Sequence, residues 1–257
     1  MAGVKKILIP IKPSELTIEK VVPYLPTILQ AFNENAVEIR KNYDTYCLQH
    51  KILGKKRVHD DDDSINNLVL EPHLMAMVDW KTGYVFGNPI KYAQTKDSNT
   101  DDITYLNKYA RYANRSAVDQ EVGMWTYATG VGYYFIQPTD ERVDTETEAP
   151  FELFCREADT CTKVYSSYNG KKPLFDMLYK CPAPTSGTIS GVQFAQVTSQ
   201  ERRVYKKRPL VEKRLNPNGI GIVEMAKCMQ DALDTIASNS VDNIQEVVNT
   251  IYKYKGI

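Results

Sequence analysis

The chain has 257 residues, and its 32 lysines and arginines balance 32 aspartates and glutamates, so the formal net charge is zero. A dedicated nucleic-acid-binding protein normally carries a basic excess, so this balance argues against that class. Apolar residues make up 42% of the chain and charged residues 25%, as in a globular protein with a substantial core. No apolar run approaches the ~18 residues that a membrane helix needs.

The first half of the chain is predicted to be helical. Residues 27–48 and 68–81 carry apolar side chains at three- and four-residue steps, the pattern of amphipathic helices. Residues 82–92, with two glycines and a proline among aromatic and β-branched residues, predict a turn into a short strand. Residues 101–127 predict a further helical region, with a possible break at residues 114–116.

After Gly130 apolar residues no longer recur at helical spacing but at every second position, which predicts strands. The predicted strands cover residues 133–137, 151–156, 162–166, 175–180, 192–198 and 203–207. Polar or Gly-, Pro- and Ser-rich linkers separate them, which favours an antiparallel β meander. Residues 222–251 then return to helical spacing over ~45 Å, with a possible kink at Asn239 and Ser240. The predicted fold class is α+β: a helical N-terminal half, an antiparallel β meander and a long C-terminal helix.

The sequence contains none of the usual catalytic or cofactor-binding motifs. The chain has no phosphate-binding Gly-x-x-x-x-Gly-Lys-Ser/Thr loop, and its two Gly-x-Gly sequences, at Gly130 and Gly219, predict turns. Cys155 and Cys161 lack a second cysteine pair at metal-ligand spacing, so no zinc site is predicted. The chain has five cysteines, an odd number scattered along the sequence, and we therefore predict that they are reduced thiols. His59 and the acidic run that follows it predict a solvated loop. With three histidines and no nucleophile elbow, the sequence predicts no enzyme, no cofactor and no metal.

One segment resembles the signature of the portal proteins of tailed bacteriophages, of the siphophage type. In that family a pair of asparagines opens a helix, an apolar residue and an aspartate end it, and an aromatic-rich turn with glycines and a proline follows. The matching positions here are Asn66, Asn67, Val78, Asp79, Gly83, Tyr84, Val85, Phe86, Gly87, Asn88, Pro89 and Ile90. Weaker similarity continues through the predicted strands to residues 231–249, and Pro72 departs from the family's uninterrupted helix.

The resemblance implies a wing-like α+β domain over residues 1–221 and a first stem helix, with the beginning of the clip, over residues 222–257. Portal subunits of this family are nearly twice as long, so the resemblance covers the wing and the first stem helix only. It assigns Tyr84, Phe86 and Tyr92 to the wing core.

The resemblance also implies a function and partners. Portal subunits form a ring, a dodecamer in this family, at the capsid vertex, where DNA is packaged and ejected without sequence specificity. The implied partners are capsid and scaffolding proteins, together with terminase and neck proteins that bind through the clip. The implied location is the virion, and the host cytoplasm during assembly. Two other classes stay open: a head-morphogenesis or adaptor protein that binds an intact portal, and a nuclease or hydrolase with an unrecognised site.

Overall fold

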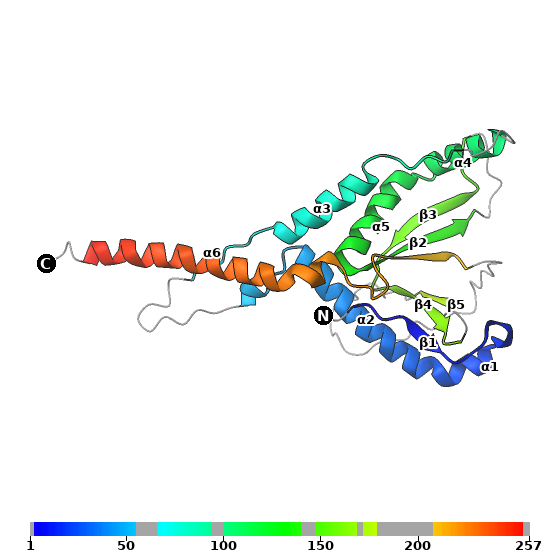
Figure 1. The fold of residues 1–257 in the computed structure, drawn as a ribbon, viewed down its shortest axis with the longest axis horizontal. Helices are drawn as coiled ribbons and strands as arrows, with labels where there is room; N and C mark the ends of the chain where they lie inside the picture. Colours follow the sequence, from blue (N-terminus) through cyan, green and yellow to red (C-terminus); the bar gives the residue numbers. More distant parts are fainter. Residues whose placement is uncertain are drawn as a thin grey trace, which may run out of the picture.

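The computed structural model describes residues 3–54, 66–93, 100–139, 147–168, 172–178 and 208–253. Figure 1 shows an α+β body from which one long helix projects, as the predicted fold class requires. The helices are α1 (Ile18–Val21), α2 (Leu25–Tyr46), α3 (His73–Phe86), α4 (Thr100–Tyr112), α5 (Arg115–Thr129) and α6 (Ile222–Lys253). Short 3-10 turns lie at Pro13–Glu15, Val22–Tyr24 and Lys51–Gly54. The strands are β1 (Ile7–Ile9), β2 (Val131–Pro138), β3 (Phe151–Arg156), β4 (Cys161–Ser166), β5 (Pro173–Leu178) and β6 (Leu210–Arg214).

The strands form two three-stranded sheets, and the consecutive pairs β2–β3 and β4–β5 are antiparallel, as predicted for a meander. One sheet has the order β3-β2-β6 and is antiparallel throughout; the other has the order β1-β4-β5, with β1 parallel to β4. Strands β2 to β5 lie close to their predicted positions, whereas β1 and β6 were not predicted. The predicted strands at residues 192–198 and 203–207 lie outside the described residues. Sheet order depends on contacts between distant segments, which period-two patterns do not encode.

The break predicted at residues 114–116 is confirmed. Asn114 lies between α4 and α5 with a left-handed backbone, at a φ of 48°. Asparagine tolerates this conformation better than most residues, because its short polar side chain clashes little and bonds locally. Helix α6 runs unbroken from Ile222 to Lys253, through Asn239 and Ser240, where a kink was considered possible.

Helix α3 begins and ends later than predicted. Residues 68–71 precede the helix, and Pro72 is its N-cap. The segment predicted to turn into a strand, from Thr82 to Phe86, instead forms the last part of α3. Four buried residues at four-residue steps, Leu74, Val78, Thr82 and Phe86, hold this helix onto the body. Their burial outweighs the helix-breaking tendency of Gly83, which amounts to ~1 kcal/mol.

Each sheet packs on helices to form its own core. The β3-β2-β6 sheet packs on α5, where Tyr133, Phe135 and Trp125 are buried and Tyr43 of α2 stacks on Trp125 at 4.2 Å between ring centroids. The other sheet packs on the N-terminal half of α2. Its core residues include Ile7, Ile9, Ile28, Phe32 and Val164. Helix α2 therefore joins the two cores.

The point where α6 leaves the body is fixed by glycines. Gly130, at the end of α5, and Gly219, before α6, have φ angles of 94° and 63°. A Cβ added to Gly130 would lie 2.3 Å from the Gly219 carbonyl oxygen, and one on Gly221 would lie 2.3 Å from the Ala128 oxygen. The two predicted turns therefore lie against each other and form one junction. Val4 adds a third chain segment by donating its N–H to the Gly219 oxygen at 2.9 Å.

Among the described residues, no helix combines the length and the apolar character needed to cross a bilayer.

Candidate assembly interface

The signature residues fall into an extended segment and a helix. Asn66 and Asn67 precede α3 and open no helix, which corrects the expectation, while Asp79, Gly83, Tyr84 and Phe86 lie within α3. Gly87 caps the helix, and Asn88 and Pro89 follow it in an irregular segment. The signature therefore spans one connected structure, in which residues 66–71 run along α6 and α3 then crosses to α5.

Residues 67–71 are held on α6 by a row of polar side chains. Asp242 accepts hydrogen bonds from the Asn67 N–H and side-chain amide, both at 2.8 Å. The Val69 N–H donates to Ser238 Oγ at 3.0 Å. The Glu71 N–H donates to Asp234 Oδ1 at 3.0 Å, and Gln230 Nε2 donates to the Glu71 oxygen at 2.6 Å.

The spacing of this row follows from backbone geometry. A two-residue step along an extended chain covers ~6.6 Å, and a four-residue step along a helix covers ~6.0 Å. Residues 67, 69 and 71 can therefore meet positions 242, 238 and 234 in turn, with the two segments running in opposite directions. We call residues 230, 234, 238 and 242 the polar row of α6; all four are buried.

The centre of the polar row is a buried histidine–aspartate pair. His50 Nδ1 lies 2.6 Å from Asp234 Oδ2, and both side chains are at most 1% exposed. The other carboxylate oxygen of Asp234 accepts from Glu71 N–H and from Gln230 Nε2 at 2.8 Å. One carboxylate thus ties three segments together: the turn after α2, the strip before α3, and α6 itself.

Asp79 has a similar linking role nearer the body. The Tyr46 hydroxyl of α2 donates to Asp79 Oδ1 of α3 at 2.7 Å. Burial, followed by this hydrogen bond to a carboxylate, raises the pKa of Tyr46, so the phenol stays protonated and continues to donate. The signature aspartate therefore joins α3 to α2.

The exposed side of α6 is apolar. Met229 is 70% exposed, Ile236 62% and Ile244 66%. Other exposed apolar residues of this helix are Met225, Leu233, Val241, Val247 and Val248. The usual arrangement of an amphipathic helix is reversed along much of α6, because the polar row faces the protein and the apolar stripe faces outward.

Helix α3 extends this apolar surface with two aromatic side chains. Trp80 and Tyr84 are 68% and 76% exposed, and their rings stack at 5.6 Å. A groove of about 560 Å³ lies between α3 and α6, lined by residues that include Leu74, Met77, Trp80, Met229 and Leu233. The expected placement of Tyr84 in the core was wrong, and Tyr92 is also partly exposed. Phe86 is buried, as expected.

Phe86 packs where α5 has a glycine. A Cβ on Gly123 would lie 2.5 Å from the Phe86 ring. On the other side, the ammonium of Lys213, a residue of strand β6, lies 4.1 Å from the centroid of the same ring. Phe86 is therefore clamped between α5 and the sheet. This contact anchors the C-terminal end of α3, and with it the aromatic pair.

We expect Gly123→Ala to destabilise the fold by about 1–2 kcal/mol, because overpacking against Phe86 outweighs the gain in helix propensity. Urea denaturation would measure this. Gly83→Ala is the matched control, since nothing lies within 4 Å of a Cβ at this helical position. It should stabilise the protein by about 0.5–1 kcal/mol. Equal effects of the two substitutions would contradict the packing described for Phe86.

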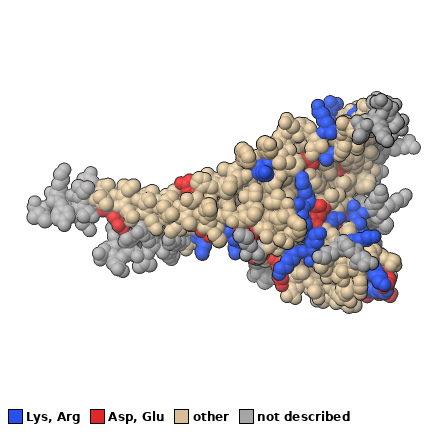
Figure 2. Space-filling view, in the orientation of Figure 1, with Lys and Arg blue, Asp and Glu red and all other residues tan. Residues whose placement is uncertain are grey.

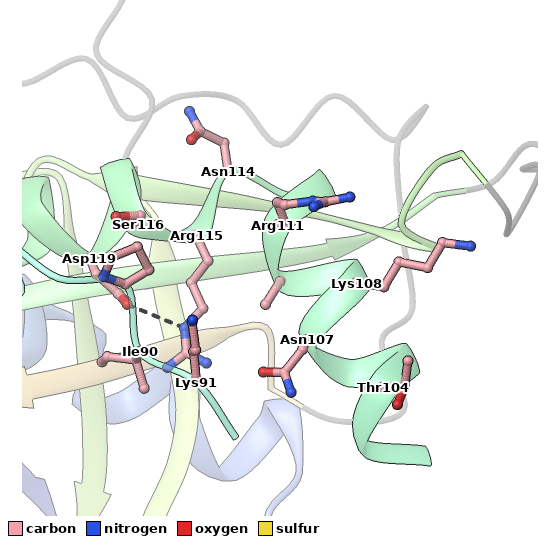
Figure 3. A pocket seen from close by; sticks show the side chains of 12 residues that line it. Ile90, Lys91, Thr104, Asn107, Lys108, Arg111, Asn114, Arg115, Ser116 and Asp119 are labelled. Atoms are coloured by element: carbon pink, nitrogen blue, oxygen red, sulfur yellow. Dashed lines mark ion pairs between the residues drawn. The ribbon is translucent and has the colours of Figure 1, made fainter. Parts of the chain in front are cut away.

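A second groove lies at the outer end of the body, between α4, α5 and residues 89–91, and has a volume of about 630 Å³. Figure 3 shows Arg115 and Asp119 facing each other in it, at 3.3 Å, while Lys108 and Arg111 extend away from them. Asn107 brackets Tyr92 by accepting from its N–H at 2.9 Å and donating to its oxygen at 3.0 Å. Arg115 of α5 also donates to the Tyr92 hydroxyl, so the segment after the signature is held by both α4 and α5.

Two of the described cysteines, Cys155 and Cys161, are held in the thiol form. Burial raises the pKa of Cys155 to about 12, and burial also raises the pKa of Cys161, so both thiols stay protonated at neutral pH. In the part of the chain that the structure describes, no three or more His, Cys, Asp or Glu side chains gather to hold a metal. His59 and the acidic run after it lie outside the described residues.

Sequence reasoning missed the polar row and His50. One signal was available, because Gln230, Asp234, Ser238 and Asp242 recur every four residues within an otherwise apolar helix. Such a row predicts a buried polar partner when the opposite stripe has no core to face. His50 gave no signal, since its partner lies far along the chain.

No protein-family model matches the chain, and no curated protein matches it.

Proposed function

We propose that this chain is a structural subunit of a tailed-phage portal, which assembles into a ring at the capsid vertex through which DNA passes. One observation carries the proposal: α6 buries its polar row and exposes its apolar stripe. The body corresponds to the wing and α6 to the first stem helix. In this proposal the ring binds capsid and scaffolding proteins, and it binds terminase and neck proteins through the clip.

The exposed apolar stripe of α6 is expected to bind another protein surface. Large contiguous apolar patches on soluble proteins mark sites of association. In Figure 1, α6 projects beyond the body, so the body of the same copy covers only its first part. In Figure 2 the projecting part presents few charges on the face seen, whereas lysines and arginines gather over the body. Neighbouring copies in a ring would cover the stripe.

The charge of α6 also suits a DNA channel. Its acidic residues are Glu224, Asp231, Asp234, Asp242 and Glu246, against Lys227 and Lys253. Lysines and arginines hold DNA by neutralising phosphates and releasing counterions, which would oppose sliding. Glu224, Asp234 and Asp242 are buried, so the excess of carboxylates does not reach the surface. A stem helix whose only cations are Lys227 and Lys253 still gives little such grip, and this supports the proposal.

Mass photometry of the purified chain tests the proposal. We expect ring-sized oligomers at micromolar concentration, and expect Ile236→Glu combined with Ile244→Glu to weaken association at least tenfold, about 1.4 kcal/mol. Both side chains are more than half exposed, so the fold should be unaffected. Tyr105→Glu, at an exposed site on α4, is the control and should leave the oligomers unchanged.

A wild-type chain that remains monomeric would contradict the ring. If that monomer were retained on an intact portal, and the double glutamate variant were not, the adaptor function would replace the proposal.

A further inference from the structure

The apolar surface of α6 lies between two different grooves. The α3 side carries the exposed, stacked Trp80 and Tyr84, which we call the aromatic knob. The α2 side has a groove of about 820 Å³, which we call the socket. The socket is lined by residues of α2 and α6, among them Ala36, Val37, Arg40, Lys41, Lys227 and Cys228.

The knob and the socket face opposite sides of α6. Met229 lines the groove beside the knob, and Asp231 lines the socket. Two residues along an α-helix turn through roughly 200°, so these side chains leave α6 in nearly opposite directions. Figure 1 agrees, because α3 and α2 diverge to opposite sides of the line of α6.

We propose that the aromatic knob of one copy inserts into the socket of the next copy, so that the chain associates head to tail. This inference rests on the proposed ring-forming function and names the two surfaces that meet. A ring needs two different patches on opposite sides of each subunit, whereas a two-fold dimer uses one patch twice. The placement of the knob and the socket meets the first requirement.

The chemistry of the two surfaces is complementary. Exposed tryptophan and tyrosine side chains often supply most of the binding energy of an interface. The socket offers Ala36 and Val37, the latter 65% exposed, and the aliphatic stems of its arginine and lysines. Arg40 is ion-paired with Asp159 and Glu157, and Lys227 with Glu224, so these two side chains offer the knob mainly their aliphatic stems. The ammonium of Lys41 suits the face of an aromatic ring.

Cross-linking of paired cysteines tests the inference on the full chain. Cys228 is an exposed native thiol in the socket, and Ala76 is an exposed residue one helical turn before Trp80. We would introduce Ala76→Cys, replace Cys47, the other thiol exposed among the described residues, and Cys181, which lies outside them, with serine, and treat the protein with a short bismaleimide. A ladder of dimers and higher species on a reducing gel is expected.

Two controls make the result specific. Adding Cys228→Ser should abolish the ladder, and Tyr105→Cys in place of Ala76→Cys should give none. A ladder that persists without Cys228, or oligomers by mass photometry that give no ladder, would overturn the inference while the ring-forming function stood. A chain that is monomeric by mass photometry would overturn both.

Discussion

Replacing Asp234 with alanine should lower the free energy of unfolding by about 3–5 kcal/mol, the usual cost of removing one member of a buried polar or ionic pair. The Asp234 side chain is 0% exposed, and its oxygens serve His50, the Glu71 N–H and Gln230. Alanine would leave all three groups buried without this acceptor. The loss of a shared carboxylate should therefore cost more than the loss of any single hydrogen bond.

Urea denaturation followed by circular dichroism would measure the effect. Asp231→Ala is the matched control, because this aspartate of the same helix is only partly buried, and its loss should cost less than about 1 kcal/mol. A double-mutant cycle with His50→Ala should show coupling of about 0.5–3 kcal/mol. Independent, additive effects of the two substitutions would show that the pair does not hold α6 to the body.

The sequence predicted those parts of the fold that depend on local pattern. The apolar stripe of α2, the break at Asn114 and strand β3 lie where the pattern placed them. The errors arise where distant contacts compete with local signals. Gly83 predicted a turn, but the buried residues on either side of it continue α3. Three residues at β1 could not reveal a partner in β4, far along the chain.

In the candidate interface, too, local pattern predicted one part and distant contacts decided the rest. Periodicity identified the apolar stripe of α6, and core packing is the usual role of such a stripe. The side of α6 that faces the body is set by residues 67–71, because their backbone groups form hydrogen bonds with the side chains of the polar row. The signature positions were singled out from resemblance, and the structure gives several of them physical roles: Asn67 bonds to Asp242, Asp79 accepts from Tyr46, and Phe86 packs against Gly123.

The glycine junction at the base of α6 should be highly sensitive to substitution. We expect Gly130→Ala to lower the free energy of unfolding by about 3–5 kcal/mol. Its φ of 94° lies where a Cβ costs roughly 1–2 kcal/mol. The added Cβ would also lie 2.3 Å from the Gly219 oxygen and 2.8 Å from the Gly221 nitrogen, and relieving such overpacking costs about 1–3 kcal/mol.

The neighbours of Gly130 cannot yield easily, because they are backbone atoms. The Gly219 oxygen accepts from the Val4 N–H, and the Gly130 oxygen accepts from the Leu215 N–H at 3.1 Å. Thermal denaturation of Gly130→Ala against Gly54→Ala would test this, since nothing lies within 4 Å of a Cβ at Gly54 and the control should be nearly neutral. A loss below about 1 kcal/mol at Gly130 would mean that the junction yields. If the loss is as large as expected, the backbone contacts at Gly130 and Gly219 fix the direction in which α6 leaves the body, and a ring needs that direction to be the same in every copy.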